Sequence, residues 1–403
     1  MGKKITVLGS SFGGYHSALE LRKLLCKEHQ IQVVSSEDVF TFIPSLPWVI
    51  IGWRKPEAIQ FNVEKSLNKL GIDFVKDTII KAEPGKNRVT GRKNKYDYDY
   101  LVVATGAELD FDAIKGTNPD QGHNHSIFSV KQAIQAHDKL MQVFDSGSGS
   151  IVLGNAQGAS CLGPVYEMTM IIDSYLRKTK SRSKFNMSLI TNEPYLGHYG
   201  VGGVGKMTRM LEDEFAERDI EWKVNCKIAE VSPDSVELED GTKYKSDFTL
   251  AVPAFYGSHA YMGIDGLANP RGFVLADDYL ANPKYQNIYT VGVSLAIAPP
   301  FKTPVPVGVP KTGQMTEAMA KSAAVNIAAD IKGKEKQKGK DFSAICIADA
   351  GDTAFYISAS PLLPPRNKLV LKKGKSVRWL KIAFEKYYMA RLRYGLPKLD
   401  FGW

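Results

Sequence analysis

Cysteine is the residue type in this chain best suited to redox or nucleophilic chemistry, and it occurs at Cys26, Cys161, Cys226 and Cys346. The four show no Cys-x-x-Cys pair and no metal-ligand spacing, so we expect no metal site. Four cysteines in 403 residues are too few for a secreted disulfide scaffold. We interpret Cys26, in an expected first helix, and Cys226 as structural, because neither lies in a motif.

Cys161 follows a strand-like run and a glycine turn, at residues 150–161 ("SIVLGNAQGASC"). This is where a dinucleotide-binding β-α-β unit opens its helix onto a pyrophosphate. Here, however, Ala156 and Ala159 occupy the second and third glycine positions, so methyl groups stand where backbone should approach the ligand. The unit is therefore expected to keep the shape of a nicotinamide domain without the ligand. The helix dipole favours a thiolate at Cys161; the alternative is a small buried apolar residue.

A similar unit begins the chain, where residues 4–25 ("KITVLGSSFGGYHSALELRKLL") predict a strand, a turn and a helix. Gly9 and Gly14 fit the first and third glycine positions, and Ser11 takes the second, where it is small enough to let a phosphate approach. After the next predicted strand, at residues 31–36, serines replace the acidic residue that usually binds a ribose. The expected cofactor contacts of this unit are Gly9, Ser11, Gly13, Gly14, Ser35 and Ser36.

Two later segments indicate that the cofactor is FAD. Residues 98–110 form a predicted strand that ends in Thr105 and Gly106, and residues 285–297 form another that ends in Gly292. In flavoproteins with two dinucleotide domains, such glycines mark the chain crossings that close the FAD site, because they let the backbone approach the cofactor. The order of the three signals therefore predicts FAD binding.

The bulk properties limit the class of protein. A chain of 403 residues is too long for one ordinary core, so at least two domains are expected. The formal net charge of +9 favours an acidic partner, either nucleic acid or an anionic membrane surface. We find no signal peptide and no apolar run of 18 residues, which predicts a cytoplasmic protein or one bound to the cytoplasmic face of a membrane.

The C-terminal segment at residues 375–395 predicts a basic amphipathic helix. Its apolar residues recur at spacings of three and four, and Lys and Arg lie between them. Such a helix suits an anionic bilayer surface; the alternative is a helix that packs on the protein's own core. The predicted apolar face consists of Val377, Leu380, Phe384, Tyr388 and Leu392.

Six segments together resemble sulfide:quinone oxidoreductases along essentially the whole chain. They are "FIPSLPWVIIGWR" (residues 42–54), "GASCLGPVYE" (158–167), "PYLGHYGVGGVG" (194–205), "GVPKTGQMTEAM" (308–319), "CIADAGDTAF" (346–355) and "KIAFEKYYM" (381–389). The resemblance implies an α/β fold with two Rossmann-like domains and a C-terminal amphipathic helical region that docks on a membrane. The implied FAD domain is discontinuous, at residues 1–110 and 256–333; the degenerate second domain spans 111–255, and the quinone and membrane region spans 334–403.

The resemblance also implies that Cys161 and Cys346 act as a pair. They would form a disulfide or a sulfur-bridged pair at the face of the flavin opposite the quinone. Hydrosulfide would attack one sulfur, leaving a persulfide and a thiolate, and two electrons would reach FAD and then a membrane quinone. Because the exchange proceeds through thiolates, we expect both thiols to have a low pKa.

Further site residues follow from the same resemblance. Glu167 is expected to be a general base or proton relay, and His198 to lie near the sulfur side; the alternatives are a helix-surface glutamate and an ordinary loop histidine. Lys311 would face the flavin or the quinone and stabilise anionic reduced flavin. Pro44 would line the flavin ring pocket, and the expected quinone contacts are Phe355, Phe384 and Tyr388.

One position departs from the family pattern: Phe128 stands where relatives carry a third cysteine, which is associated with flavin tethering or sulfur traffic. We therefore expect FAD to be bound without a covalent link. The expected partners are sulfide, a membrane quinone and an anionic membrane surface, with no nucleic acid, and a homo-oligomer is left open. Because both cysteines precede it, removal of the tail from about Gly374 is expected to leave sulfide reduction of the flavin intact.

Three other functions compete with this one. A type II NADH:quinone oxidoreductase shares the scaffold but needs an intact second glycine turn. The flavoprotein subunit of a flavocytochrome c sulfide dehydrogenase normally carries an export signal. A basic nucleic-acid or membrane-binding protein without flavin would fit the charge alone, but Lys and Arg are spread along the chain rather than clustered with aromatic residues.

Overall fold

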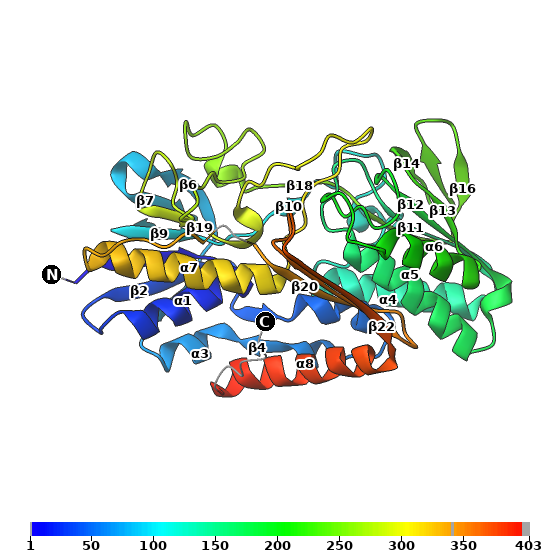
Figure 1. Cartoon of the computed structure of the whole chain (residues 1–403), viewed down its shortest axis with the longest axis horizontal. Helices are drawn as coiled ribbons and strands as arrows, with labels where there is room; N and C mark the ends of the chain where they lie inside the picture. Colours follow the sequence, from blue (N-terminus) through cyan, green and yellow to red (C-terminus); the bar gives the residue numbers. More distant parts are fainter. Residues whose placement is uncertain (1, 340–341, 397–403) are drawn as a thin grey trace.

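The computed structural model describes residues 2–339 and 342–396, which form two lobes side by side (Figure 1). The first lobe is built on a five-stranded parallel sheet in the order β19-β9-β1-β2-β5. Helices α1 and α7 pack against each other beside it. The elements of this lobe are β1 (Lys4–Leu8), α1 (Phe12–Leu24), β2 (Gln30–Ser35), α3 (Val63–Asn68), β5 (Asp73–Lys76), β9 (Tyr100–Val103), β19 (Ile288–Thr290) and α7 (Gly313–Ile331).

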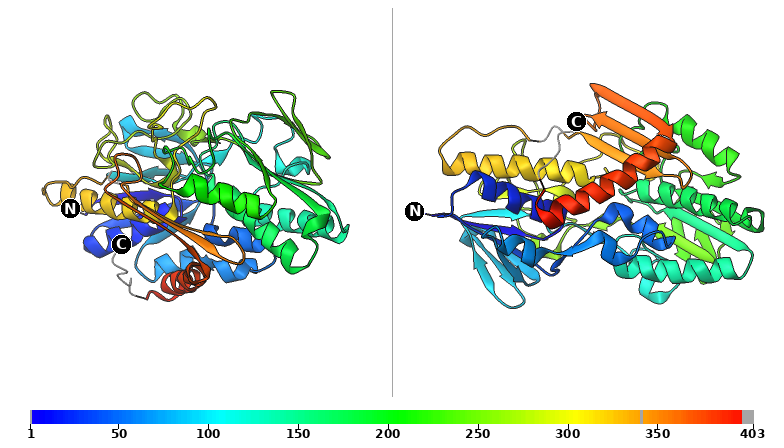
Figure 2. Two further views of the ribbon diagram at one scale, coloured as in Figure 1. Left: turned by 45° about the vertical axis from the view of Figure 1, so that its right-hand side comes forward. Right: turned by 90° about the horizontal axis from the view of Figure 1, so that it is seen from below.

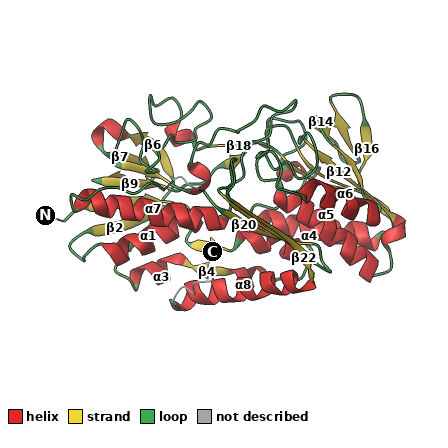
Figure 3. Ribbon diagram, viewed as in Figure 1, coloured by secondary structure: helices red, strands yellow, loops and turns green. Residues whose placement is uncertain are grey.

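The second lobe repeats this plan with a four-stranded parallel sheet in the order β13-β12-β11-β17. Helices run along the sheets of both lobes (Figure 3), and strands covered on both faces are buried along nearly their whole length. The elements are α4 (Val130–Asp145), β11 (Gly149–Asn155), α5 (Gly163–Lys178), β12 (Phe185–Thr191), α6 (Met207–Glu217), β13 (Glu221–Lys223) and β17 (Phe248–Val252).

Small antiparallel sheets, which the sequence analysis did not predict, decorate both lobes. The β10-β18 pair lies where the chain crosses between the lobes. The remaining elements are α2 (Leu46–Ile50), β3 (Val39–Thr41) with β4 (Gln60–Asn62), β6 (Ile79–Glu83) with β7 (Arg88–Gly91) and β8 (Lys95–Asp97), β10 (Glu108–Leu109) with β18 (Phe255–Tyr256), and β14 (Ile228–Val231) with β15 (Ser235–Leu238) and β16 (Lys243–Lys245).

The C-terminal region combines a sheet with the predicted helix. Strands β20 (Ala344–Asp349), β21 (Ala354–Ser360) and β22 (Lys368–Gly374) form an antiparallel sheet, and α8 (Lys375–Tyr394) follows it without a loop. Figure 2 shows α8, in red, crossing the underside of the molecule. No described helix combines the length and hydropathy needed to cross a bilayer. The tail is therefore a sheet and a helix, where the sequence predicted a helix alone.

The predicted α/β fold with two Rossmann-like units is confirmed, whereas the exact domain boundaries stay a prediction. Strand β19 returns the chain to the first sheet, as expected for a discontinuous domain. One detail is corrected: α1 ends at Leu24, so Cys26 lies after the first helix and not in it. The basic stretch at residues 332–340 is a loop as far as Gly339, and Lys340 lies outside the described residues.

Candidate active site

The first glycine turn joins the carboxyl end of β1 directly to α1. Gly9 has a φ of +97°, which favours glycine, and its N–H donates to Val34 O at 2.8 Å. A Cβ placed on Gly14 would lie 1.8 Å from Gly9 O, and one on Gly9 would lie 2.4 Å from Ala104 O. These glycines therefore allow the helix to begin directly against the sheet.

The N-terminus of α1 is suited to an anion. Ser11 is the N-cap residue, but its side chain makes no capping hydrogen bond, and the first helical turn carries no acidic residue. Gly13 is packed against the crossings, where an added Cβ would lie 3.1 Å from both Ala104 Cβ and Val291 Cγ2. The uncapped N–H groups and the helix dipole favour a pyrophosphate at this end.

The two predicted chain crossings meet beside this turn. Gly106, with a φ of +78°, donates its N–H to Ser294 Oγ at 2.8 Å, and Ser294 Oγ donates to Gly106 O at 3.1 Å. Ser294 follows Gly292 in the second crossing, and Thr105 Oγ1 accepts from Tyr261 at 3.4 Å. A Cβ on Gly106 would meet no atom within 4 Å, so there is open space beside this backbone. Sequence reasoning missed Ser294, which lies two residues after a glycine that it identified.

The remaining predicted FAD contacts lie around the same strand ends. Ser35 is buried at the end of β2 and accepts a hydrogen bond from Ser10 Oγ at 2.9 Å, while Ser36 is exposed. Pro44 is exposed in the short 3-10 turn Ile43–Ser45. Ligands of parallel α/β sheets bind at the carboxyl ends of the strands. The glycine cradle, the uncapped helix and the open space beside Gly106 together fit an FAD.

Lys311 is a half-buried cation two residues before the start of α7. Its Nζ lies 5.1 Å from the centre of the Phe273 ring, and burial lowers its pKa to about 8. Among the residues that the structure describes, no carboxylate forms an ion pair with it. A partly desolvated cation of this kind suits a neighbouring group that becomes anionic during the reaction.

The second glycine turn, between β11 and α5, is already paired with the chain itself. Gly158 N–H donates to Pro306 O at 2.7 Å, and Gly308 N–H donates to Ala159 O at 3.0 Å. Asn192 Nδ2 donates to the same Pro306 O at 2.8 Å. Residues 305–309, called the covering segment below, therefore occupy one N–H and one carbonyl of the turn at which a nicotinamide dinucleotide would bind. No sequence pattern indicated this contact.

The structure brings the two predicted cysteines together. Cys161 lies two residues before the start of α5, and Cys346 lies in β20 opposite Ile357 of β21; both are partly exposed free thiols. Burial raises the pKa of Cys161 to about 12, with a further rise from the charge of Cys346, and burial also raises the pKa of Cys346 to about 11. The expectation of two low-pKa thiols is thus wrong for this structure, because desolvation outweighs the helix dipole.

Glu167 lies beside this pair, on the buried side of α5, and is not a helix-surface residue. Its carboxylate forms an ion pair with Lys381 of α8. Burial raises the pKa of Glu167 to about 7, although Lys381 opposes the rise. The charge of Glu167 in turn raises the pKa of Cys346, and Lys381 lowers it. A carboxyl and an ammonium group that form an ion pair thus act on this thiol with opposite sign.

A row of charged residues on the inner side of α8, at Arg378, Lys381 and Glu385, was missed by sequence reasoning. Arg378 Nε donates to Asp349 at 3.0 Å, and Glu385 accepts from Arg54 Nε at 2.8 Å. Charged residues at helical spacing within the predicted amphipathic helix were the available signal, but the sequence analysis assigned the basic ones to an anionic bilayer surface or, as the alternative, to solvent. In the structure they fasten α8 to β20 and to the segment that follows α2.

His198 is not brought to the cysteines by any hydrogen bond among the described residues. It is buried in the glycine-rich loop before α6, where Nδ1 accepts from Gly200 N–H at 3.1 Å. Its ring packs edge-on against Tyr195 at 5.1 Å. Burial lowers the pKa of His198, which favours the neutral ring. Its predicted role near the sulfur side stays a prediction.

The three quinone candidates occupy different environments. Tyr388 is buried with its ring 5.0 Å from Phe42 and 5.6 Å from Phe384, and its hydroxyl lies 2.8 Å from His16 Nε2. Phe384 is 36% exposed, so this aromatic group reaches the surface. Phe355 is only 1% exposed and lies in the core beneath Lys373. Phe384 and Tyr388 thus lie together, and Phe355 lies apart from them.

The single apolar face predicted for α8 is wrong, because the helix has two. Val377, Tyr388 and Leu392 are buried, but Leu380 and Phe384 point outward and are 38% and 36% exposed. The charged row occupies part of the inner side, so the apolar residues are divided between core and surface. The outer apolar face, defined here by Trp379, Leu380, Phe384 and Tyr394, includes Trp379 at 68% exposure.

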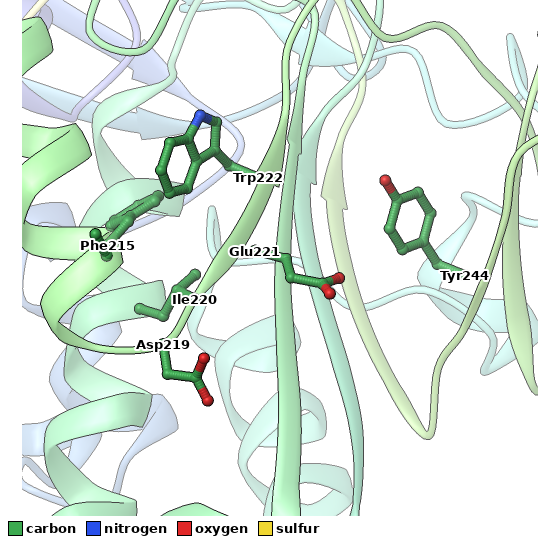
Figure 4. Close-up of a pocket in the computed structure, with 7 residues that line it drawn as sticks. Phe215, Asp219, Ile220, Glu221, Trp222 and Tyr244 are labelled. Atoms are coloured by element: carbon green, nitrogen blue, oxygen red, sulfur yellow. The ribbon is translucent and has the colours of Figure 1, made fainter.

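Two other features carry no candidate site. A shallow hollow of about 400 Å³ between α6 and β13 is lined by residues such as Phe215, Trp222 and Tyr244 (Figure 4), and none of the predicted site residues lines it. Cys26, Glu28 and His29 lie close enough together to hold a metal ion. However, His29 Nδ1 accepts from Lys3 N–H at 3.0 Å, which places the ring proton on the nitrogen that faces Glu28.

Comparisons with known proteins agree with this arrangement. A family model described as pyridine nucleotide-disulphide oxidoreductase matches residues 3–297. The sulfide-quinone reductase of Aquifex aeolicus is 39% identical over 98% of this chain and 92% of that protein. The crystal structure of the sulfide:quinone oxidoreductase from Aquifex aeolicus has a TM-score of 0.93 over the same shares, at 38% identity. The type II NADH:quinone oxidoreductase of Staphylococcus aureus is 23% identical over 89% of this chain and 91% of that protein.

Proposed function

The chain belongs to the pyridine nucleotide-disulphide oxidoreductase family and, within it, to the sulfide:quinone oxidoreductases, and we propose how its side chains perform that reaction. The enzyme oxidises sulfide and transfers the electrons to a quinone. The first glycine turn would hold FAD, which would supply the two-electron redox chemistry that links the sulfur side to the quinone. The single observation that carries the proposed mechanism is the convergence of Cys161 and Glu167 from the start of α5, Cys346 from β20 and Lys381 from α8.

Cys161 and Cys346 form the sulfur-handling pair. In the oxidised pair, hydrosulfide attacks one sulfur, and the electron pair of the broken bond stays on the other as a thiolate. Lys381 opposes the burial that disfavours a thiolate on Cys346, and Glu167 takes or returns a proton beside it. Lys311 stabilises negative charge on the flavin side.

The covering segment indicates that NADH is not the electron donor. It occupies the backbone groups of the second turn at Gly158 and Ala159, so a dinucleotide would have to displace part of the protein. The same segment leads directly to Lys311, which ties it to the flavin side. We therefore assign the second Rossmann-like unit a role in placing Cys161 and not in binding a nicotinamide.

Anaerobic mixing tests this function. The purified FAD-loaded enzyme is titrated with sulfide and, in parallel, with NADH, while flavin absorbance is recorded; a short-chain quinone is then added. We expect sulfide to bleach the flavin and quinone to restore the colour. Rapid bleaching by NADH without bleaching by sulfide would overturn the assignment in favour of the type II NADH enzyme.

We propose that FAD is held without a covalent bond. The position associated with tethering is Phe128, whose ring packs edge-on against Phe255 at 5.3 Å and offers no nucleophile. Acid precipitation of the enzyme should leave the yellow colour in the supernatant. Flavin that stays with the pellet would contradict this and would indicate another attachment site.

We also propose that the outer apolar face of α8 docks the enzyme on an anionic membrane, where the lipid-soluble quinone resides. Exposed Lys375 and Lys386 accompany this face, and each basic residue near anionic lipid adds about 1 kcal/mol to binding. Burial of apolar area adds roughly 25 cal/mol per Å². Phe384 belongs both to this face and to the aromatic group around Tyr388, so docking and quinone entry would share one surface.

The structure changes how this docking should be tested. Truncation at Gly374 would also remove Lys381 and leave Glu167 buried without its cation, so the expectation that sulfide reduction survives truncation no longer holds. The better variant is Trp379→Ser with Leu380→Ser, which alters only the outer face. It should lose co-sedimentation with anionic liposomes while sulfide still bleaches the flavin. Trp222→Ser, at a 37% exposed tryptophan of the second lobe, is the control; equal binding by both variants would contradict the proposal.

A further inference from the structure

The C-terminal sheet has an apolar face that begins at Cys346. Residues directly opposite each other on neighbouring antiparallel strands point to the same face of a sheet. Cys346 lies opposite Ile357 of β21, and Ile357 in turn lies opposite Leu371 of β22. The neighbouring row on the same face consists of Ala344, Ala359 and Leu369. These two rows, called the Cys346 face below, are apolar apart from the thiol.

The two ends of this sheet surface differ. Beyond the Cys346 face at one end, Phe355 is buried beneath Lys373, which forms an ion pair with Glu214 of α6. At the other end Leu369 is 39% exposed, and Leu371 beside it is partly buried. The apolar surface that starts at the thiol therefore reaches solvent at Leu369 and is closed by an ion pair in the opposite direction.

The glycine-rich loop before α6 lies against the open end. Gly205 has a φ of +57°, and a Cβ placed on it would lie 2.7 Å from Leu369 Cδ2 and 3.4 Å from Leu371 Cδ1. Three residues earlier in the same loop, a Cβ on Gly202 would lie 2.4 Å from the ring of Phe301, which is 47% exposed. Exposed apolar side chains of two segments thus contact one loop where the Cys346 face reaches solvent.

We propose that the Cys346 face binds a growing chain of zero-valent sulfur that is carried by Cys346. This inference rests on the proposed function. Sulfur atoms in a chain carry no hydrogen-bond donor and are weak acceptors, so an apolar wall suits them better than water does. The face is continuous with the thiol that would carry the chain, and it ends at the surface, where the chain can leave.

The chain grows by one sulfur atom in each cycle. Hydrosulfide attacks the sulfur that is bonded to Cys161 Sγ, and a new S–S bond forms at the end of the chain on Cys346. The broken bond leaves its electron pair on Cys161 as a thiolate. Two electrons then leave through the flavin to the quinone, the proton of the hydrosulfide is released, and Cys161 bonds to the added sulfur.

A count of bound sulfur tests the proposal. The purified FAD-loaded enzyme is given sulfide and an excess of short-chain quinone, then desalted and denatured, and cyanide converts its zero-valent sulfur to thiocyanate. Leu371 is two strand spacings, about 10 Å, from Cys346, and each S–S bond spans about 2 Å, so the parent enzyme should hold at least about five sulfur atoms. Leu371→Asn should hold about two-fold fewer, because its amide would be left unpaired against sulfur. A parent enzyme that holds a single sulfur atom would overturn the proposal.

Val370→Asn is the matched control, because Val370 is also partly buried on β22 but points to the opposite face of the sheet. It should keep the sulfur count of the parent enzyme. Leu369→Asn, at the exposed end, should lower the count in the same direction as Leu371→Asn. Equal counts in Leu371→Asn and Val370→Asn would overturn the proposal. A changed oligomeric state with an unchanged count in Leu369→Asn would also overturn it and would assign this face to a second copy of the chain.

Cys346→Ser separates failure of this inference from failure of the proposed function. If sulfide still bleaches the flavin in Cys346→Ser, the proposed function itself is wrong. If bleaching needs Cys346 but the parent enzyme holds a single sulfur atom, only the binding of a sulfur chain is wrong.

Discussion

The molecule builds the same strand-turn-helix unit twice and uses the two turns in different ways. In the first, Gly9 and Gly14 bring the backbone so close that no side chain would fit, and the start of α1 is left uncapped. In the second, Gly158 and Ala159 are paired with Pro306 and Gly308 of the covering segment. The sheets behind both turns are parallel and buried. Whether a Rossmann unit can bind a dinucleotide thus depends on a few backbone groups of its turn. The sheet behind the turn does not determine whether those groups are free.

The second turn carries Cys161 where a Rossmann unit would otherwise meet its dinucleotide. The start of α5 places Cys161 beside Cys346, and the following helical turn carries Glu167 to the same place. The covering segment runs on to Lys311, so under the proposed function the element that covers the second turn also leads to the flavin side. In that proposal the first unit binds the cofactor, the second unit supplies Cys161, and the C-terminal sheet supplies Cys346.

The largest expected effect would come from replacing either cysteine of the sulfur-handling pair. Cys161→Ser and Cys346→Ser should each lower sulfide-dependent quinone reduction by at least ~10³-fold, because the exchange needs both sulfurs. Bound FAD should be retained, since the first turn is untouched. Steady-state assays with flavin quantification measure both, and Cys226→Ser is the control. Near wild-type turnover in either variant would show that sulfide oxidation does not need both cysteines, and would contradict the proposed role of the second turn.

The second-largest expected effect is loss of FAD binding when a side chain is added in the first turn. Gly14→Ala should abolish FAD binding or folding, because the new Cβ would lie 1.8 Å from Gly9 O, a backbone atom that cannot move away. Gly163→Ala, at the start of α5, should keep FAD, because a Cβ there meets no atom within 4 Å. The absorbance ratio of flavin to protein measures the outcome. Equal FAD content in the two variants would remove the contrast between the turns.

A smaller effect is expected when the second turn is restored toward a nicotinamide site. NADH should reduce the flavin poorly, and Ala156→Gly with Ala159→Gly should not change this, because Pro306 and Gly308 still occupy the turn. Stopped-flow mixing with NADH measures it. Bleaching at micromolar NADH in the double variant would show that the two methyl groups, and not the covering segment, exclude the dinucleotide.

The smallest effect concerns the buried carboxyls of the second unit. Burial raises the pKa of both Glu167 and Glu193 to about 7, above the value of about 4.5 for an unfolded glutamate. Between these values the native state binds more protons than the unfolded state, so the free energy of unfolding should fall as pH rises, by up to about 1.4 kcal/mol per pH unit for each group. Urea titrations between pH 5 and pH 7 should show a smaller slope for Glu193→Gln than for the parent. Identical slopes would contradict the raised pKa.

Local signals predicted most of the fold. The glycine spacing at Gly9 and Gly14, the crossings at Gly106 and Gly292, and the periodicity of residues 375–395 each lie within one segment, and all three elements are present. The sheet β20-β21-β22 was missed because its outer strand, with Lys368, Lys372 and Lys373, is mostly exposed and lacks an apolar run.

The candidate site was less predictable, because it depends on contacts between distant segments. The pairing of Cys161 with Cys346 came from the family resemblance, since spacing along the chain does not report proximity. The partner of Lys381 could not be read from α8, because a charged residue at helical spacing looks the same on a solvated face as in a buried ion pair.

The covering segment acts on the second turn as an intramolecular competitor. Because it is tethered on both sides, through β19 and α7, its effective concentration at the turn is in the millimolar range or above. A diffusible dinucleotide would have to outcompete a ligand that can never be diluted or depleted. If the covering segment excludes nicotinamide as proposed, the flow of electrons from sulfide does not depend on the ratio of oxidised to reduced nicotinamide in the cell.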